Sequence, residues 1–137
     1  MIRYIAAYLG AGLVMAVLDA IWLTTMANRL YRPVIGDIMA DKPDMRAAVV
    51  FYLIYLAGVV FFAVAPALRD GGLMRAVIWG ALLGALAYAT YDLTNQATLS
   101  VWSTRITVID IAWGALLTAL TASGGYLAAR GAERLAG

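Results

Sequence analysis

The stretch AYATYDLTNQATLSVWSTRITVIDIAWGALL, residues 87–117, joins two apolar segments through a short polar link. Its two ends are rich in Ala, Leu, Ile and Val, as membrane helices are, whereas its middle carries amide, hydroxyl and charged side chains. Asp92 lies just before the link and Asp110 just after it. A helix that reaches the membrane surface and a helix that returns would place both carboxylates at a similar depth. The stretch therefore predicts a helical hairpin with a polar site near its connection.

The composition of the whole chain is typical of a membrane protein. Of its 137 residues, 64% are apolar and 13% are charged, whereas a soluble domain is roughly half apolar and about 25% charged. The chain has no Cys and no His, which excludes disulfides, thiol catalysis, His-ligated haem and the usual zinc sites. A net charge of +2 without a basic stripe argues against nucleic-acid binding.

Four apolar segments are long enough to cross a bilayer. Each has about 22–24 residues, and a helix needs about 20 to span a hydrocarbon core of ~30 Å. The first is longer than the apolar core of a signal peptide, so we expect it to be retained. Because the segments do not alternate as strands would, we expect an all-α, integral membrane four-helix bundle. It would form one domain over residues 1–137, with spans at 4–27, 47–68, 73–94 and 107–129.

The connections predict further features of the bundle. Residues 69–72, Arg-Asp-Gly-Gly, predict a tight turn between the second and third helices, with Pro66 helping to end the second. In the long first link, Pro33 suits a first helical turn. We therefore expect a short amphipathic helix at about 33–40 that lies on the membrane interface. Four spans place both termini on the same side, but the ten basic residues divide five to five between the two sides, so the orientation is undetermined.

Small residues predict where the helices approach one another. Gly80-x-x-x-Gly84 in the third segment and Gly12-x-x-x-Ala16 in the first would both allow close contact between backbones. Packing inside the bundle is the first interpretation of both motifs. A surface for a partner protein is the alternative.

The acidic residues within the spans gather in one half of the predicted bundle. Asp19 lies about eight residues, or ~12 Å, before the end of the first helix, on the same side as Asp92 and Asp110. An ionisable group near the bilayer centre costs at least roughly 2.5–3.5 kcal/mol, so such groups usually face the bundle interior and pair. Helical spacing adds neighbours to these three acids. The candidate ligand-binding residues are Asp19, Trp22, Tyr88, Asp92, Asn95, Asp110 and Trp113.

A second interpretation of the two link carboxylates stays open at this point. Asp92 and Asp110 could be interfacial residues in contact with water. Asp110 would then stabilise the positive N-terminal end of its helix, and Arg105 could pair with one of the two acids.

Three functions suit the predicted site. The leading hypothesis is binding, extended to possible translocation, of a small or lipid-like molecule, because carboxylates beside aromatic rings suit a cation or a polar head group. The second is an accessory or assembly subunit of a larger membrane complex, or a homo-oligomer, with Gly80-x-x-x-Gly84 as its interface. The third is an intramembrane enzyme that uses paired carboxylates as acid and base, so catalytic activity is undecided. We expect no cofactor, although Asp92, Asn95 and Asp110 offer oxygen ligands to a hard divalent cation.

Several motifs resemble those of a bacterial inner-membrane family known as domain of unknown function 2177. They are LDAIWL at 18–23, YDLTNQATL at 91–99, Trp102, and DIAWG at 110–114. The resemblance covers nearly the whole chain, and the run at 91–99 is its most specific part. It implies a four-helix, multi-pass protein of the bacterial inner membrane and no particular activity. It also implies that the signature residues here are Asp19, Trp22, Asp92, Asn95, Asp110 and Trp113.

Overall fold

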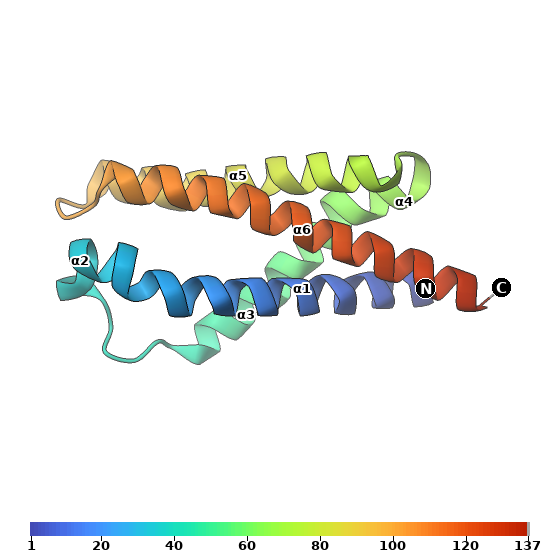
Figure 1. Ribbon diagram of the computed structural model, residues 1–137, viewed down its shortest axis with the longest axis horizontal. Helices are drawn as coiled ribbons and strands as arrows, with labels where there is room; N and C mark the ends of the chain where they lie inside the picture. Colours follow the sequence, from blue (N-terminus) through green and yellow to red (C-terminus); the bar gives the residue numbers. More distant parts are fainter. Residues whose placement is uncertain (137) are drawn as a thin grey trace.

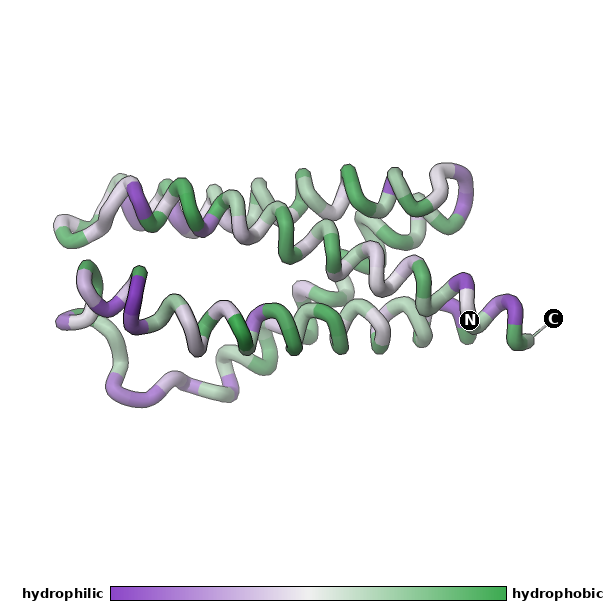
Figure 2. Tube along the Cα trace, in the orientation of Figure 1, coloured by the Kyte–Doolittle hydropathy of each residue, from purple (hydrophilic) through white to green (hydrophobic). Residues whose placement is uncertain are grey.

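The computed structural model describes residues 1–136, and within them the chain is helical and contains no strand. Four helical runs are long and apolar enough to cross a membrane, so the predicted all-α membrane fold is confirmed. The runs alternate in direction, and both termini lie at one end of the bundle (Figure 1). Hydrophilic residues gather at the two ends and in the link before α3, with hydrophobic residues between them (Figure 2). The runs are Ile2–Ile38, Met45–Asp70, Gly72–Thr98 and Thr104–Ala136.

The first run is longer than the span predicted at 4–27. Helix α1 (Ile2–Met26) continues through a π-helical turn, η1 (Ala27–Tyr31), into α2 (Arg32–Ile35) and a 3-10 turn, η2 (Gly36–Ile38). The short helix predicted at about 33–40 is therefore present, and Pro33 lies in its first turn as expected. It is joined to α1 by a continuous helical backbone rather than by a loop.

The second run contains another π turn. Helix α3 (Met45–Val59) begins at Asp44, whose carboxylate accepts hydrogen bonds from the backbone N–H groups of residues 46 and 47 at 2.9 and 3.3 Å. It continues through η3 (Val60–Val64) into α4 (Ala65–Asp70). The expectation that Pro66 helps to end this helix is wrong. Pro66 occupies the first turn of α4, directly after the wider π turn, where its missing N–H is tolerated.

The turn between the second and third runs agrees with its prediction. Helix α4 ends at Asp70, and α5 (Gly72–Thr98) starts two residues later. Gly72 has a φ of 66°, a left-handed conformation that glycine adopts at little cost. Arg75 bonds Asp70 across the turn at 2.8 Å. The tight reversal makes α4 and α5 antiparallel neighbours.

Helix α6 (Thr104–Ala136) packs against α5 along a stripe of small residues. A Cβ added at Gly80 would lie 2.7 Å from the carbonyl oxygen of Thr118, and one added at Gly84 would overlap the carbonyl oxygen of Gly114. Both glycines therefore let α5 approach α6 inside the chain. The first interpretation of this motif, packing within the bundle, is correct.

The crossing of α1 with α6 uses different glycines from those that the sequence indicated. A Cβ at Gly10 would lie 3.0 Å from the carbonyl oxygen of Gly124, and one at Gly125 would lie 2.9 Å from that of Ala7. Gly12 instead faces Leu56 of α3 at an ordinary contact distance of 3.4 Å, and Ala16 is exposed. The Gly12-x-x-x-Ala16 motif is therefore not the place where two backbones meet closely.

Helix α3 contacts the rest of the bundle less extensively and is tied to it by tyrosines. Its residues Phe51 and Ile54 have exposed fractions of 51% and 68%, as expected for side chains that face lipid. The hydroxyl of Tyr8 donates to the carbonyl of residue 53 at 3.0 Å. Tyr55 and Thr118 share a hydrogen bond of 2.8 Å. These bonds hold α3 against α1 and α6.

Candidate functional site

Three carboxylates are buried in the half of the bundle that lies away from the termini. The exposed fractions of Asp19, Asp92 and Asp110 are 7%, 0% and 4%. They come from α1, α5 and α6, the three helices that form the centre of the bundle. The interpretation of Asp92 and Asp110 as residues in contact with water is not compatible with this burial. Each needs a donor, a proton or a cation, because an isolated buried charge is costly.

Asp110 ends a short chain of hydrogen bonds. The Trp22 Nε1–H donates to the Tyr31 hydroxyl at 2.9 Å, and that hydroxyl donates to Asp110 Oδ1 at 2.6 Å. The three residues lie on α1, η1 and α6. The chain therefore links the end of the first helical run to the start of the fourth.

The π turn η1 places Tyr31 where it can make this link. A regular α-helix advances about 100° per residue, so nine residues would put Tyr31 about half a turn away from Trp22. A π turn has more residues per turn than an α-helix, so each residue advances by a smaller angle around the helix axis. Over η1 this smaller advance places Tyr31 closer to the face that carries Trp22. The two side chains are consequently in direct hydrogen-bond contact.

The indoles of Trp22 and Trp113 stack on each other. Their ring centroids are 4.3 Å apart and their planes differ by 6°. Each Trp lies three residues after a buried Asp, so the two Asp-x-x-Trp segments of the sequence meet face to face. The Trp113 Nε1–H is buried and has no hydrogen-bond partner among the described residues.

Asp19 is tied to the second helical run. The Tyr52 hydroxyl of α3 donates a hydrogen bond to Asp19 Oδ2. This contact joins α3 to the single acidic residue of α1. Asp19 thus has a neutral donor, and no basic residue in the described part of the chain forms an ion pair with it.

Asp92 is the least satisfied of the three acids. Neither of its carboxylate oxygens has a hydrogen-bond partner among residues 1–136. Asp92 lies on α5, which packs against α6, the helix that carries Asp110. Two adjacent buried carboxylates repel each other when both are ionised, so a shared proton or a nearby cation would stabilise the pair. The arrangement favours binding of positive charge.

A pocket of about 360 Å³ opens beside these residues. Asp19 and Asp110 line it, and no Lys or Arg does. A neighbouring hollow of about 350 Å³ shares Asp110 and Tyr88 with it. Leu23, Ile35 and Met39 complete the wall, together with the aromatic residues Trp22, Tyr31, Phe51, Tyr52, Tyr88 and Tyr91.

The pocket is lined by four of the seven residues that the sequence predicted as a ligand-binding site. Asp19, Trp22, Tyr88 and Asp110 line the pocket. Tyr88 also packs over Gly114, where a Cβ would overlap its ring. The other three candidates, Asp92, Asn95 and Trp113, do not line it.

Sequence reasoning missed two tyrosines that complete the site. Tyr31 lies in the predicted link after the first span, and Tyr52 lies within the span predicted at 47–68. A signal for Tyr52 was present, because a phenol hydroxyl within an apolar span needs a hydrogen-bond partner. Tyr31 had no comparable signal, since its position depends on the π turn.

The family of the chain follows from a match over most of its length. Residues 4–127 match the family described as "Predicted membrane protein (DUF2177)". The chain belongs to this family. All seven candidate site residues lie within the matched region. No curated protein and no solved structure shows a significant similarity to the chain.

In this DUF2177 protein, part of the 91–102 motif region stabilises the hairpin rather than the pocket. The Thr107 hydroxyl donates to Gln96 Oε1 at 2.7 Å and accepts from the Trp102 Nε1–H at 3.0 Å. Gln96 also donates to Thr104 at 2.9 Å. The Trp102 ring packs edge-on against Tyr91, with centroids 5.8 Å apart. These contacts join the end of α5 to the start of α6 and so fix where Asp92 and Asp110 meet.

The candidate metal site at Asp92, Asn95 and Asp110 has little support from the structure. Among residues 1–136, no group of three or more acidic side chains is placed to hold a metal ion. Asp92 and Asp110 are both buried, on α5 and α6, and Asn95 is half-buried on the same helix as Asp92. A divalent cation at these three residues stays a hypothesis from sequence.

Proposed function

We propose that the protein binds a small organic molecule with a positively charged head at the pocket lined by Asp19 and Asp110. The observation that carries the proposal is the charge of this wall. Two buried carboxylates face one pocket of about 360 Å³, and no basic residue lines it. Its size lies in the range of small-molecule sites, roughly 300–1,000 Å³.

The aromatic wall supports a cationic head rather than a neutral one. Tyr52, Tyr88, Tyr91 and Trp22 are among the residues that line the pocket. An ammonium group within about 6 Å of such a ring gains roughly 0.5–2 kcal/mol, with the higher values in dry sites. A cation would also relieve the repulsion between the buried carboxylates. Binding and neutralisation would therefore reinforce each other.

The other two hypotheses have weaker support. The accessory-subunit hypothesis used Gly80-x-x-x-Gly84 as its interface, but both glycines are buried against α6. The enzyme hypothesis used Asp92 and Asp110 as acid and base, but Asp92 does not line the pocket that a substrate would enter. The ligand-binding hypothesis, in contrast, relies on residues that line the pocket.

The test compares choline with its neutral isostere, 3,3-dimethyl-1-butanol, by titration calorimetry of the protein in a nonionic detergent. We expect choline to bind at least 10-fold more tightly than the isostere. Asp19→Asn and Asp110→Asn should each weaken choline binding by at least 10-fold. Asp70→Asn is the control, because Asp70 is exposed at the end of α4 and lines neither this pocket nor the neighbouring hollow.

Two results would contradict the proposal. One is equal affinity of the wild-type protein for choline and for the isostere. The other is unchanged choline binding in both pocket variants. The comparison of the two ligands uses the wild-type protein alone, so it decides the matter even where a variant fails to fold.

A further inference from the structure

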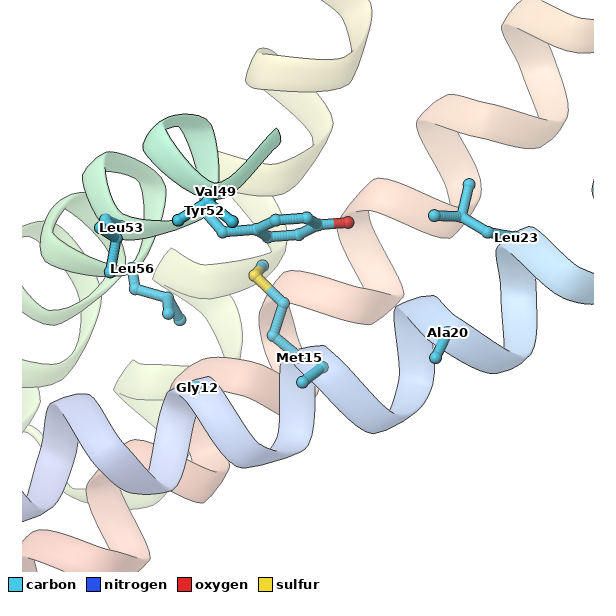
Figure 3. Close-up of a pocket in the computed structure, with 9 residues that line it drawn as sticks. Gly12, Met15, Ala20, Leu23, Val49, Tyr52, Leu53 and Leu56 are labelled. Atoms are coloured by element: carbon cyan, nitrogen blue, oxygen red, sulfur yellow. The ribbon is translucent and has the colours of Figure 1, made fainter. Parts of the chain in front are cut away.

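An apolar groove of about 370 Å³ runs between α1 and α3. On its α1 side, Met15 and Leu23 line the groove together with three small residues, Gly12, Ala16 and Ala20. The three small residues follow one another at intervals of four and so lie on one stripe of the helix. The α3 side of the groove includes Val49 and Leu53 (Figure 3). Because Gly12, Ala16 and Ala20 have small side chains or none, the space between this stripe of α1 and the facing side of α3 is left unfilled. The Gly12-x-x-x-Ala16 motif thus forms a groove instead of a close helix crossing.

The groove opens to the lipid-facing surface. Ala16 and Ala20 are exposed, and Val49 and Leu53 have exposed fractions of 51% and 53%. Its lining is almost wholly apolar, with the Tyr52 hydroxyl as its polar group. A molecule dissolved in the bilayer could therefore enter from the side without passing through water.

The groove lies next to the aspartate-lined pocket. Leu23 and Tyr52 line both spaces, and the Tyr52 hydroxyl donates to Asp19 at the boundary. In Figure 3 the ring of Tyr52 extends from α3 over Met15, with its hydroxyl farthest from α3. One side chain therefore touches an apolar space and an acidic space at the same time.

We infer that the ligand is a cationic amphiphile, with its head between Asp19 and Asp110 and its single apolar tail in the groove between α1 and α3. This inference rests on the proposed function, because the acidic pocket supplies the head site. The charge of the pocket selects the class of amphiphile. Two carboxylates repel a phosphate or carboxylate head and attract an amine or quaternary ammonium. The groove accepts the tail because its lining is as apolar as the lipid that the tail leaves.

The test locates the tail directly. The probe is dodecyltrimethylammonium with a photoreactive diazirine at the end of its chain, added to the full-length protein in a nonionic detergent. Illumination is followed by peptide mass spectrometry. We expect labelling of residues 12–23 and 49–56 to exceed that of the exposed Leu82 and Leu86 of α5 by at least fivefold. Excess choline should remove this preference, since it competes for the head site.

Paired variants then examine the groove itself. Ala16→Phe places a ring in the groove and should lower labelling of the two segments by at least fivefold. Ala112→Phe is the matched control, because Ala112 is an exposed alanine of α6 that lines neither space. Thermal unfolding of each variant identifies any that fail to fold, and the labelling pattern of the wild-type protein does not depend on them.

The outcomes separate the two proposals. Labelling spread evenly over all lipid-facing helices, in a protein that prefers choline to its isostere, overturns the position of the tail and leaves the head site intact. Loss of the preference for choline overturns the head site, and the amphiphile inference with it. Preferential labelling of the groove in wild type, reduced by Ala16→Phe and by choline, supports both.

Discussion

Tyr31 is the residue on which the hydrogen bonds of the site converge. Its hydroxyl accepts from Trp22 and donates to Asp110, and each of these partners is half-buried or buried. Neither partner makes another hydrogen bond through the same atom among the described residues. The hydroxyl is therefore shared by two groups that would otherwise lie unsatisfied in a low-dielectric surrounding, where an unmade hydrogen bond is expensive.

Replacement of Tyr31 by Phe should destabilise the protein by about 1–3 kcal/mol. The ring would stay in place, but the Trp22 N–H and the Asp110 carboxylate would both lose their partner. Thermal unfolding in detergent, followed by circular dichroism, measures the effect. Tyr126→Phe is the control, because the Tyr126 hydroxyl makes no hydrogen bond in the part of the chain described here. Equal melting temperatures for the two variants would contradict the prediction.

At the same scale, sequence and structure agree on the acids and differ on their partners. The carboxylates could be located from sequence because an ionisable residue in an apolar span is conspicuous and costly. Tyr31 and Tyr52 were not found, because their roles arise from a π turn and from the placement of α3, which no local pattern records. Asn95 lies on the helix of Asp92, as helical spacing predicts, but it does not line the pocket beside Asp110, so its role as a ligand-binding residue stays a prediction.

Among the elements, α6 is the one around which the bundle is organised. Its small residues face α5 at Gly114 and face α1 at Gly124 and Gly125. The glycines of α5 could be interpreted correctly from sequence, since their spacing of four residues is a local signal. The partner helix could not, because the same spacing in α1 at Gly12 forms a groove. The arrangement of all the helices decides which face of a helix packs closely against the backbone of its neighbour.

Two Gly→Ala substitutions in helix interiors should have opposite effects. A Cβ at Gly84 would overlap backbone of α6, which cannot move as a flexible side chain can, so Gly84→Ala should cost about 1–3 kcal/mol. A Cβ at Gly58 of α3 would meet nothing within 4 Å, so Gly58→Ala should stabilise by about 0.5–1 kcal/mol through its better helix propensity.

Thermal unfolding of the two variants beside wild type checks this pair. The comparison is well matched, because the same methyl group is added to the same residue type in both helices. A melting temperature for Gly84→Ala that equals or exceeds that of Gly58→Ala would show that α5 does not pack closely on α6. Unchanged unfolding of Gly84→Ala would also restore Gly80-x-x-x-Gly84 as a surface for a partner.

For the whole molecule, length and hydropathy were sufficient to predict the fold class. Four segments of adequate length permit few arrangements, because a backbone in lipid must satisfy its own hydrogen bonds. Helix ends were less predictable. The π turn η1 continues the first run past residue 27, where its span was predicted to end, and the π turn η3 continues the second run through Pro66. Helix α2 and the α5–α6 link lie at the end of the bundle opposite to the termini (Figure 1). The acidic pocket belongs to this end, because Ile35 of α2 is part of its lining.

This arrangement predicts a topology in which the two termini share one side of the membrane and the acidic pocket opens toward the other. An even number of crossings requires the shared side, although five basic residues on each side leave its identity to experiment. Paired reporters, one active only in the cytoplasm and one only outside it, can be fused before Met1 and after Gly137. Both fusions should activate the same reporter, whereas an insertion after Ser100, in the α5–α6 link, should activate the other. Opposite reporters at the two termini would mean that one of the four runs does not cross the membrane, and the run least packed against the others, that of α3, would be the first to examine.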